Sequence, residues 1–209
     1  MLSRPSKIVC IGRNYVEHAR ELGNDVPAEP LIFLKPPSAI IGDGDYIELP
    51  PQSSQVEHEG EIGIVIGRRL RRASESEATA AIQGIAPLND VTARDLQRTD
   101  GQWTRAKGFD TFCPVGPVHE GRVDLGSLEI ITRVNGDVRQ RAKSSQMVFP
   151  IPMLLSYISH VMTLEPGDLV ATGTPAGISR LSPGDTVEVE IVGVGRVRNP
   201  VRAARAVSS

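Results

Sequence analysis

The sequence predicts a β-rich α+β fold with a few peripheral helices. Short runs of β-branched and apolar residues recur along the whole chain, and clusters of Gly, Pro, Asn and Asp separate them. Helical periodicity is confined to a few short segments. The predicted strands cover residues 7–12, 31–35, 46–49, 62–66, 85–88, 169–172 and 186–192, with a hairpin over residues 128–138.

Length and composition favour a single domain over residues 1–209. The chain has 40% hydrophobic residues and no break in composition, which suits one sizeable core. Its formal net charge of -2 gives no reason to expect nucleic acid or an anionic membrane as a partner. The apolar runs are too short to cross a bilayer, and the basic N-terminus precedes no apolar signal segment. We therefore expect a cytoplasmic protein.

An acidic segment leads directly into the most apolar of these strands. Side chains alternate faces along a strand, so Glu59 and Glu61 project to one side with Cα atoms about 6.5 to 7 Å apart, and Glu57 continues the row. The charges could be the solvated end of the strand. However, like charges beside an apolar core are costly, and a hard cation bound between the carboxylates would relieve that cost.

A short N-terminal helix carries a histidine and a carboxylate on one face. Asn14 is a suitable N-cap and Glu17 follows at capping-box spacing, so residues 15–22 are predicted to be helical. His18 and Glu21 are three residues apart and therefore lie within reach of each other. Such a pair is either an ordinary surface pair or part of a functional site.

Three further segments could contribute to a site. Asp90 follows the strand over residues 85–88, where it is either a helix cap or a third carboxylate aimed at the same point as the acidic strand. Lys107 lies among aromatic residues in the irregular segment 99–117, as either a surface lysine or a substrate-binding cation. The loop 172–177 consists of small residues whose amides and hydroxyls could approach an anion closely.

The remaining patterns predict structure and not chemistry. Ser74 and Glu77 form a second capping-box signature, which opens a helix that ends near residue 83. Residues 147–162 are predicted to form a helix with an apolar stripe. The basic run 68–72 is interpreted as a solvated turn, and the two cysteines as packing residues.

Six motifs, in their order along the chain, resemble those of the fumarylacetoacetate hydrolase family. One alone would be weak, whereas six that together cover nearly the whole chain are specific. The resemblance implies a mixed β-roll fold, usually assembled as a homodimer. The motifs are Gly12-Arg13-Asn14-Tyr15 followed by His18 and Glu21, His58-Glu59 with Glu61 and Gly63, Asp90-Val91-Thr92-Ala93-Arg94-Asp95, Lys107-Gly108-Phe109-Asp110, Gln146-Met147-Val148-Phe149 and Thr172-Gly173-Thr174-Pro175.

The resemblance also implies a metal site. Mg²⁺ or Mn²⁺ would be held by three carboxylates, which in this sequence are Glu59, Glu61 and Asp90. Gly60 departs from the family, because relatives commonly carry a larger residue between the two glutamates. The three ligands are intact, but we expect the packing around Gly60 to differ.

Catalytic and substrate-binding roles follow from the same resemblance. His18 and Glu21 would form a water-activating dyad on a lid helix within about residues 12–25. Lys107 would stabilise developing negative charge. The segment 95–103 is short for the family, so detailed substrate contacts there are not carried over. The positions that match substrate-binding residues are Arg13, Arg94, Gln97 and Thr174.

Together these expectations describe a metal-dependent hydrolase of small 2-oxo acids. The chain resembles the short acylpyruvase branch, which lacks an extra N-terminal domain. We expect cleavage of a carbon-carbon bond in a 2,4-dioxo acid, of the acylpyruvate or fumarylpyruvate type, to pyruvate and a carboxylic acid. One alternative is decarboxylation of oxaloacetate or its keto-enol tautomerisation, which uses the same enolate. Another is a non-catalytic, metal-dependent binder of dicarboxylates.

Overall fold

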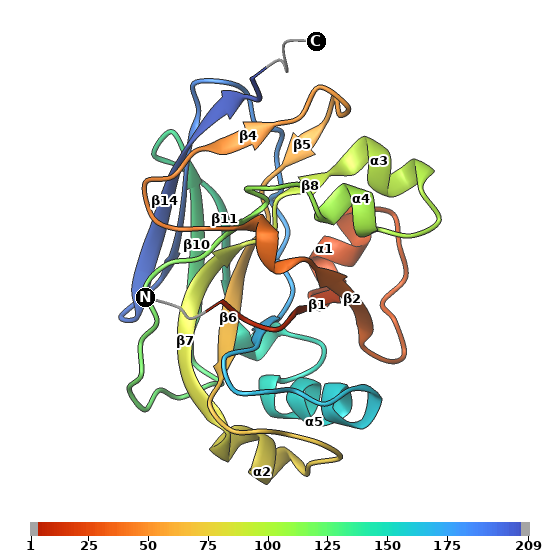
Figure 1. The fold of residues 1–209 in the computed structure, drawn as a ribbon, viewed down its shortest axis with the longest axis vertical. Coiled ribbons are helices and arrows are strands. Elements are labelled where there is room, and N and C mark those ends of the chain that lie inside the picture. Colours follow the sequence, from red (N-terminus) through yellow and green to blue (C-terminus); the bar gives the residue numbers. More distant parts are fainter. Residues whose placement is uncertain (1–3, 206–209) are drawn as a thin grey trace.

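Two five-stranded sheets form the body of the structure, a computed structural model that describes residues 4–205 (Figure 1). Two of the strand pairings within the sheets are parallel, and the others are antiparallel. The first sheet has the order β2 (Leu31–Lys35), β1 (Ile8–Gly12), β12 (Leu169–Ala171), β6 (Gly60–Ile66) and β7 (Ile82–Asn89). The second has the order β11 (Asp137–Lys143), β10 (Glu129–Val134), β13 (Thr186–Ile191), β14 (Gly195–Ala203) and β4 (Ile47–Leu49).

Short strand pairs and short helices complete the fold, and the prediction of a β-rich fold with few helices is confirmed. Within residues 4–205, no helix is long and apolar enough to cross a membrane. Two small pairings join β3 (Ile40–Ile41) to β9 (Cys113–Pro114) and β5 (Val56–Glu57) to β8 (Thr92–Ala93). The helices are α1 (Val16–Glu21), α2 (Glu75–Ala80), α3 (Arg94–Thr99), α4 (Thr104–Lys107) and α5 (Ile151–Val161), with 3-10 turns at Pro37–Ala39 and Ser144–Gln146.

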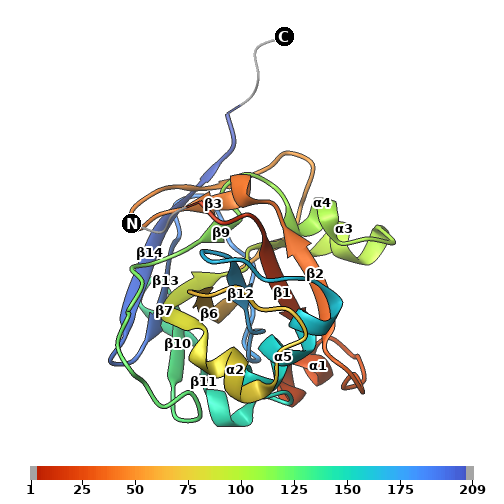
Figure 2. The same cartoon turned by 60° about the horizontal axis from the view of Figure 1, so that its bottom comes forward.

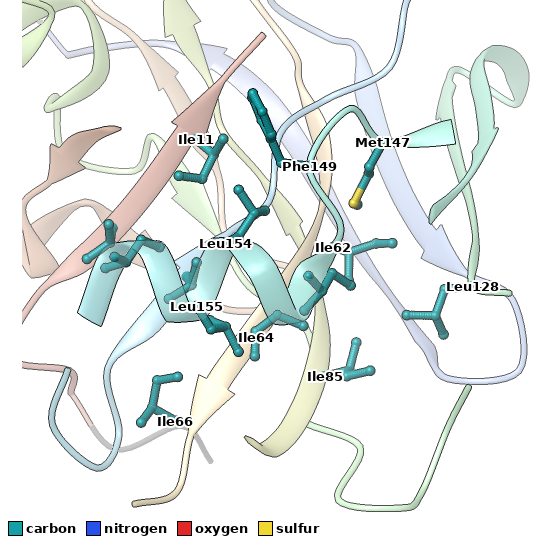
Figure 3. Close-up of a cluster of buried hydrophobic side chains, with 14 of the residues drawn as sticks. Ile11, Ile62, Ile64, Ile66, Ile85, Leu128, Met147, Phe149, Leu154 and Leu155 are labelled. Carbon is teal, nitrogen blue, oxygen red and sulfur yellow. The ribbon is translucent and has the colours of Figure 1, made fainter. Parts of the chain in front are cut away.

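The largest hydrophobic cluster packs α5 against the first sheet and also includes residues of the second sheet, such as Ile130 of β10 and Val189 of β13. Leu154 and Leu155 of α5 pack in one cluster with Ile62 and Ile64 of β6 (Figure 3). Burial of each such side chain contributes about 1.5 to 3 kcal/mol relative to exposure. Helix α2 lies beside α5 on the same side of the molecule (Figure 2). All seven residues of β6 are buried. Strand β6 is therefore held firmly in position at the centre of the fold.

The register between β6 and β7 places two polar segments side by side. Gly60 pairs with Asn89 in this antiparallel ladder, so the residue before β6 lies next to the residue after β7. The amide of Asp90 donates to the carbonyl oxygen of Glu59 at 2.8 Å. The amide of Glu59 in turn donates to the side-chain oxygen of Asn89 at 2.9 Å. These bonds fix the backbone from which two carboxylates project.

Most predicted strands occur within a few residues of their expected bounds, and one long strand was missed in addition to the two-residue strands β3, β8 and β9. The hairpin turns at Asn135 and Gly136, whose φ angles of 55° and 90° are the positive values that a type I′ turn requires. Strand β14 was not predicted. The buried Val197 lies between the exposed Arg196 and Arg198, and the buried Val201 lies between Pro200 and Arg202, so the segment contains no apolar run that would have revealed it.

Two predicted helix starts are wrong. Asn14 does not cap α1, whose N-cap residue is Tyr15. Instead, its side-chain nitrogen donates to the carbonyl oxygens of Phe149 and Thr172, and its side-chain oxygen accepts from the amide of Phe149 at 2.8 Å. Helix α5 begins only after Pro150, because the backbone is extended at Met147 and at Pro150. The capping box at the start of α2 is formed as predicted.

Candidate active site

Three carboxylates meet where β6 begins and β7 ends. One oxygen atom from each of Glu59, Glu61 and Asp90 lies within 4.8 Å of the other two. All three side chains are buried. Glu61 belongs to β6, Glu59 directly precedes it, and Asp90 directly follows β7. The strand register described above therefore brings together residues that are about thirty positions apart in the chain.

Glu57 does not join this group, and the expectation of one continuous row of glutamates is wrong. Residues 58–59 belong to neither β5 nor β6, so the alternation of a single strand is interrupted there. Glu57 instead accepts hydrogen bonds from Nε of Arg94 at 2.8 Å and from Nε2 of Gln55 at 2.6 Å.

Two lysines bind the carboxylates of this cluster. Nζ of Lys107 lies 2.8 Å from Oε2 of Glu59 and 2.6 Å from Oδ2 of Asp90. Nζ of Lys35 lies 2.6 Å from the other oxygen of Asp90 and 3.1 Å from the carbonyl oxygen of Val91. Both lysines are almost fully buried. Lys107 is therefore no surface lysine, and Asp90 accepts a hydrogen bond on each of its carboxylate oxygens.

Arg94 links the cluster to the helix that follows it. Its guanidinium binds Glu59 as well as Glu57, and it also contacts the side-chain oxygen of Gln97. Arg94 is buried at the first position of α3. The hydrogen bonds of Arg94 therefore go to other protein side chains. One of them holds the carboxylate of Glu59 in its orientation.

The two glutamates of the cluster have opposite electrostatic environments. Burial acts to raise the pKa of Glu59, but the charges of Lys107 and Arg94 outweigh burial and the pKa is lowered. Burial also raises the pKa of Glu61, and the negative charges of Asp90 and Glu59 raise it further. Glu61 is therefore the carboxylate whose charge the protein compensates least.

The donor set fits a hard divalent cation. It offers only carboxylate oxygens, which suit Mg²⁺ or Mn²⁺. Glu61 accepts the amide of Gly173 on Oε2 at 2.7 Å, and its other oxygen has no hydrogen-bond partner among residues 4–205. In this part of the fold four buried carboxylates face three buried cations, which leaves negative charge that a metal ion would neutralise. They are Glu57, Glu59, Glu61 and Asp90 with Lys35, Arg94 and Lys107.

A cavity of about 480 Å³ opens beside the cluster. This volume is in the range of small-molecule sites. Every residue predicted to act in catalysis or binding lines it except Asp90, which is fully buried. The lining residues that were predicted are Arg13, His18, Glu21, Glu59, Glu61, Arg94, Gln97, Lys107 and Thr174.

His18 and Glu21 form a hydrogen-bonded pair on α1. Nδ1 of His18 lies 3.2 Å from Oε2 of Glu21, and the amide of Gly177 donates to Oε1 of Glu21 at 3.0 Å. Burial acts to raise the pKa of Glu21, but the hydrogen bonds from His18 and Gly177 lower it. Glu21 is therefore ionised at neutral pH, and it connects α1 to the loop 172–177.

The hydroxyl of Thr174 is already committed within the protein. It donates to the carbonyl oxygen of Gly60 at 2.9 Å and accepts from Nε2 of Gln140 at 2.8 Å. The side-chain oxygen of Gln140 also accepts the amide of Gly60 at 3.0 Å. Because its one proton points to Gly60, Thr174 has no hydroxyl proton left for a substrate anion. Gln140, which sequence reasoning missed, therefore braces both the loop and the link between the two glutamates.

An aromatic pair forms another part of the cavity wall. Phe33 and Trp103 meet edge to face with ring centroids 5.2 Å apart, and Nζ of Lys107 lies 4.9 Å from the centroid of Phe33. Neither aromatic residue was predicted to line the site. Trp103 lies in the segment 99–117 that was predicted to be irregular, and Lys35 is the charged last residue of the apolar strand predicted over residues 31–35. That ending was the available signal for Lys35.

Comparison with known proteins identifies the family. A family model described as fumarylacetoacetate (FAA) hydrolase C-terminal matches residues 7–202. The chain is 43% identical over 195 residues to a mitochondrial oxaloacetate decarboxylase of Dictyostelium discoideum, covering 90% of this chain and 89% of the relative. It is 42% identical over 212 residues to a mitochondrial oxaloacetate tautomerase of Bos taurus, covering 96% and 68% of the two chains.

The fold is also shared with solved structures. The crystal structure of 2-hydroxyhepta-2,4-diene-1,7-dioate isomerase from Mycobacterium marinum superposes with a TM-score of 0.88 at 49% sequence identity. The similarity covers 96% of this chain and 75% of the other. The residues around the cavity, and both sheets except Ala203 at the end of β14, fall within the range 7–202 that the family model matches.

Proposed function

The chain belongs to the fumarylacetoacetate hydrolase family, and on that basis we propose that it is a metal-assisted enzyme that forms an enolate from a small 2-oxo acid. Keto-enol tautomerisation of oxaloacetate is the reaction that we propose first, with decarboxylation as the competing outcome of the same enolate chemistry. Similarity to an oxaloacetate decarboxylase and an oxaloacetate tautomerase favours these reactions over the carbon-carbon hydrolysis expected from sequence.

One observation carries the proposal. A single cavity combines an all-oxygen cluster, a buried ammonium group and a histidine-carboxylate pair. In enolisation, the carboxylate cluster with its cation and the ammonium group would stabilise negative charge on oxygen. The histidine-carboxylate pair would move a proton at carbon. A divalent cation held by Glu59, Glu61 and Asp90 would supply Lewis-acid stabilisation of the substrate's oxygen atoms.

His18 is the proposed proton acceptor at C3 of the substrate. Its Nδ1 is engaged with ionised Glu21, which fixes the proton of a neutral imidazole on Nδ1. Nε2 then has a free lone pair that can accept the C3 proton, and the resulting imidazolium is stabilised by Glu21. The same Nε2 returns the proton to carbon or delivers it to oxygen, which completes tautomerisation.

Lys107 is the proposed donor to the developing enolate. Burial acts to lower its pKa, but the charges of Asp90 and Glu59 outweigh burial and the pKa is raised, so the group is an ammonium ion. An ammonium has three N–H donors, and two are bound to Asp90 and Glu59. The third remains for a substrate oxygen.

The second candidate function is hydrolysis of a carbon-carbon bond in a 2,4-dioxo acid. The observation in its favour is the same dyad, because His18 could accept a proton from water as readily as from carbon. The released fragment would be a pyruvate enolate, as in the decarboxylation of oxaloacetate, so the cluster and Lys107 would again stabilise negative charge on an enolate oxygen.

A product-resolved assay separates these reactions. The purified protein with Mg²⁺ is given oxaloacetate, acetylpyruvate and fumarylpyruvate in parallel, and enol, CO₂ and carboxylic acid products are followed by absorbance and NMR. We expect accelerated enol-keto exchange of oxaloacetate, lost in His18→Ala. Faster release of acid plus pyruvate from a dioxo acid would overturn the proposal in favour of the hydrolase. Metal binding without turnover of any substrate would favour the non-catalytic binder.

A further inference from the structure

Two arginines in the cavity wall have no carboxylate partner among residues 4–205. Arg13 and Arg98 both line the cavity. In the described part of the chain, neither takes part in an ion pair within 4.0 Å, whereas Arg94 and Lys107 of the same wall are bound to carboxylates. The positive charge that the protein leaves uncompensated in this cavity is therefore located at Arg13 and Arg98.

Arg98 is held in place by a neutral group. It lies on α3 four residues after Arg94, so both arginines share one helix face, about 6 Å apart along the axis. Its Nη2 donates to the side-chain oxygen of Gln55 at 2.7 Å, and Gln55 donates to Glu57 at 2.6 Å. An amide partner orients the guanidinium without neutralising it, and the other N–H groups of Arg98 remain for a ligand.

Arg13 reaches the cavity from the turn between β1 and α1. Its backbone has φ of 58°, in the left-handed region that costs a non-glycine residue about 1 to 2 kcal/mol. Such costs are usually retained where geometry serves a site. The turn directs the side chain of a half-buried arginine toward the same space as Arg98.

The cavity wall carries both acidic residues and cations. Glu59 and Glu61 belong to the acidic cluster and Glu21 is paired with His18, whereas neither Arg13 nor Arg98 makes an ion pair within residues 4–205. The aromatic pair also lines the cavity and offers apolar contact for a short carbon chain. A ligand that matches this pattern carries a metal-binding 2-oxo acid at one end and a second anionic group at the other.

We propose that Arg98, assisted by Arg13, binds a second carboxylate of the substrate and so selects 2-oxo dicarboxylates over 2-oxo acids with a neutral tail. The guanidinium fork suits a carboxylate, which it can bind through two parallel N–H···O bonds. The inference deepens the proposed function and rests on it for the position of the 2-oxo acid end. Arg98 was not among the residues predicted from the sequence.

Binding of two matched probes tests this proposal. 2-Oxoglutarate and 2-oxovalerate have the same number of carbon atoms and differ at the distal end, which is a carboxylate in the first and a methyl group in the second. Calorimetric titration of each into Mg²⁺-loaded wild type should give at least about tenfold tighter binding of 2-oxoglutarate, as expected for a charge-assisted hydrogen bond. Arg98→Met should reduce that preference about three- to tenfold and leave 2-oxovalerate binding unchanged.

Control variants make the outcome specific. Arg71→Met removes an exposed arginine far along the chain in the turn 68–72 and should leave both affinities unchanged. Arg98→Lys should recover part of the preference, because the charge returns without the fork. Equal weakening of both probes by Arg98→Met, or no change in either, would overturn the proposal. The two binding titrations do not require turnover. If the protein bound 2-oxoglutarate preferentially but did not tautomerise oxaloacetate, the role of Arg98 would stand and the proposed reaction would be wrong.

Discussion

The ammonium group of Lys107 lies 2.6 Å from Oδ2 of Asp90, a carboxylate whose other oxygen lies 2.6 Å from the ammonium group of Lys35. Asp90 is fully buried, so both ion pairs are shielded from water. Lys107 also binds Glu59, which makes it an internal cation shared by two of the three candidate metal ligands. Metal binding and the position of Lys107 should therefore be coupled.

Lys107→Met should strengthen metal binding while it abolishes turnover. Removal of one partner from buried ion pairs typically destabilises a protein by about 3 to 5 kcal/mol, so the metal-free variant should unfold at a lower temperature. Glu59 and Asp90 would then attract Mg²⁺ without competition from an ammonium. Thermal unfolding across a MgCl₂ titration should show a larger metal-induced stabilisation than in wild type. A smaller one would refute the coupling.

Glu61→Gln should stabilise the metal-free protein and weaken its binding of Mg²⁺. The glutamine side chain keeps an oxygen that can accept the backbone N–H of Gly173. It carries no charge, whereas burial and neighbouring carboxylates raise the pKa of Glu61 by disfavouring its ionised form. The metal-free variant should be more stable than wild type, by about 1 kcal/mol, because like-charge repulsion with Asp90 and Glu59 is relieved. Mg²⁺ should no longer stabilise it. Urea unfolding with and without Mg²⁺ checks both points, with exposed Glu75→Gln as control.

The dyad should affect proton transfer and not metal binding. His18→Gln should lower kcat for tautomerisation about 10²- to 10⁴-fold, the usual contribution of a general base. Glu21→Gln should cost less, because the imidazole remains but loses its ionised partner. Mg²⁺-induced thermal stabilisation should be unchanged in both variants. His160→Gln, on the exposed face of α5, is the matched control and should retain full activity. Loss of metal binding in His18→Gln would contradict this division of roles.

Asp95 should make stability depend on pH in the acidic range. Burial acts to raise its pKa, but hydrogen bonds from the side chain of Ser53 and the amide of Ser54 lower the pKa to about 2. Because the folded pKa is below the unfolded value, this stabilisation is complete above about pH 4 and is lost as the pH falls through 2. Asp95→Asn should therefore cost about 1 to 2 kcal/mol at neutral pH, allowing for partial exposure.

At pH 3 the difference between Asp95→Asn and wild type should shrink by roughly half, since part of the unfolded and folded populations is protonated. Urea unfolding of both proteins at pH 7 and pH 3 measures this difference in the free energy of unfolding. A difference that stays constant between the two pH values would show that the carboxylate charge contributes nothing. Exposed Asp25→Asn serves as the control.

Gly60→Ala should disrupt the junction between the two glutamates. A Cβ atom at this position would lie 1.9 Å from Oγ1 of Thr132, whose buried hydroxyl has no hydrogen-bond partner in the described part of the chain. Overpacking of this kind typically costs about 1 to 3 kcal/mol. Thr132→Ala removes the obstructing atom, so the double variant should regain stability and Mg²⁺ binding relative to Gly60→Ala. Additive losses in the double variant would show that Thr132 is not the cause.

The sequence predicts the structure best where local pattern and long-range packing agree. The β-branched run of β6 predicted a buried strand, and all seven of its residues are buried. The turn at Asn135 and Gly136 was likewise predictable, because few other residue pairs accept two positive φ angles. In both cases the chemistry of adjacent residues already determines the conformation.

Long-range partners account for the errors. Asn14 has the sequence context of an N-cap, but three hydrogen bonds to residues more than 130 positions away replace that role. Lys35 is buried because Asp90 and the carbonyl of Val91 receive its ammonium, and nothing near Lys35 in the sequence indicates either partner. Glu57 left the expected row because the strand breaks after it. Such contacts depend on topology that periodicity does not encode.

The parallel pairing of β1 with β12 joins segments about 160 residues apart. We therefore expect the acidic cluster and the His18-Glu21 pair to form at different stages of folding. The acidic cluster depends on two strands adjacent in sequence, whereas Glu21 meets Gly177 only after a closure of 156 residues. Because closing a longer loop costs more entropy, we expect contacts of the cluster to form at lower cost than those of the dyad. Mutations that weaken the β1-β12 seam should therefore leave a protein that still captures a cation but can no longer hold the imidazole where a proton must move.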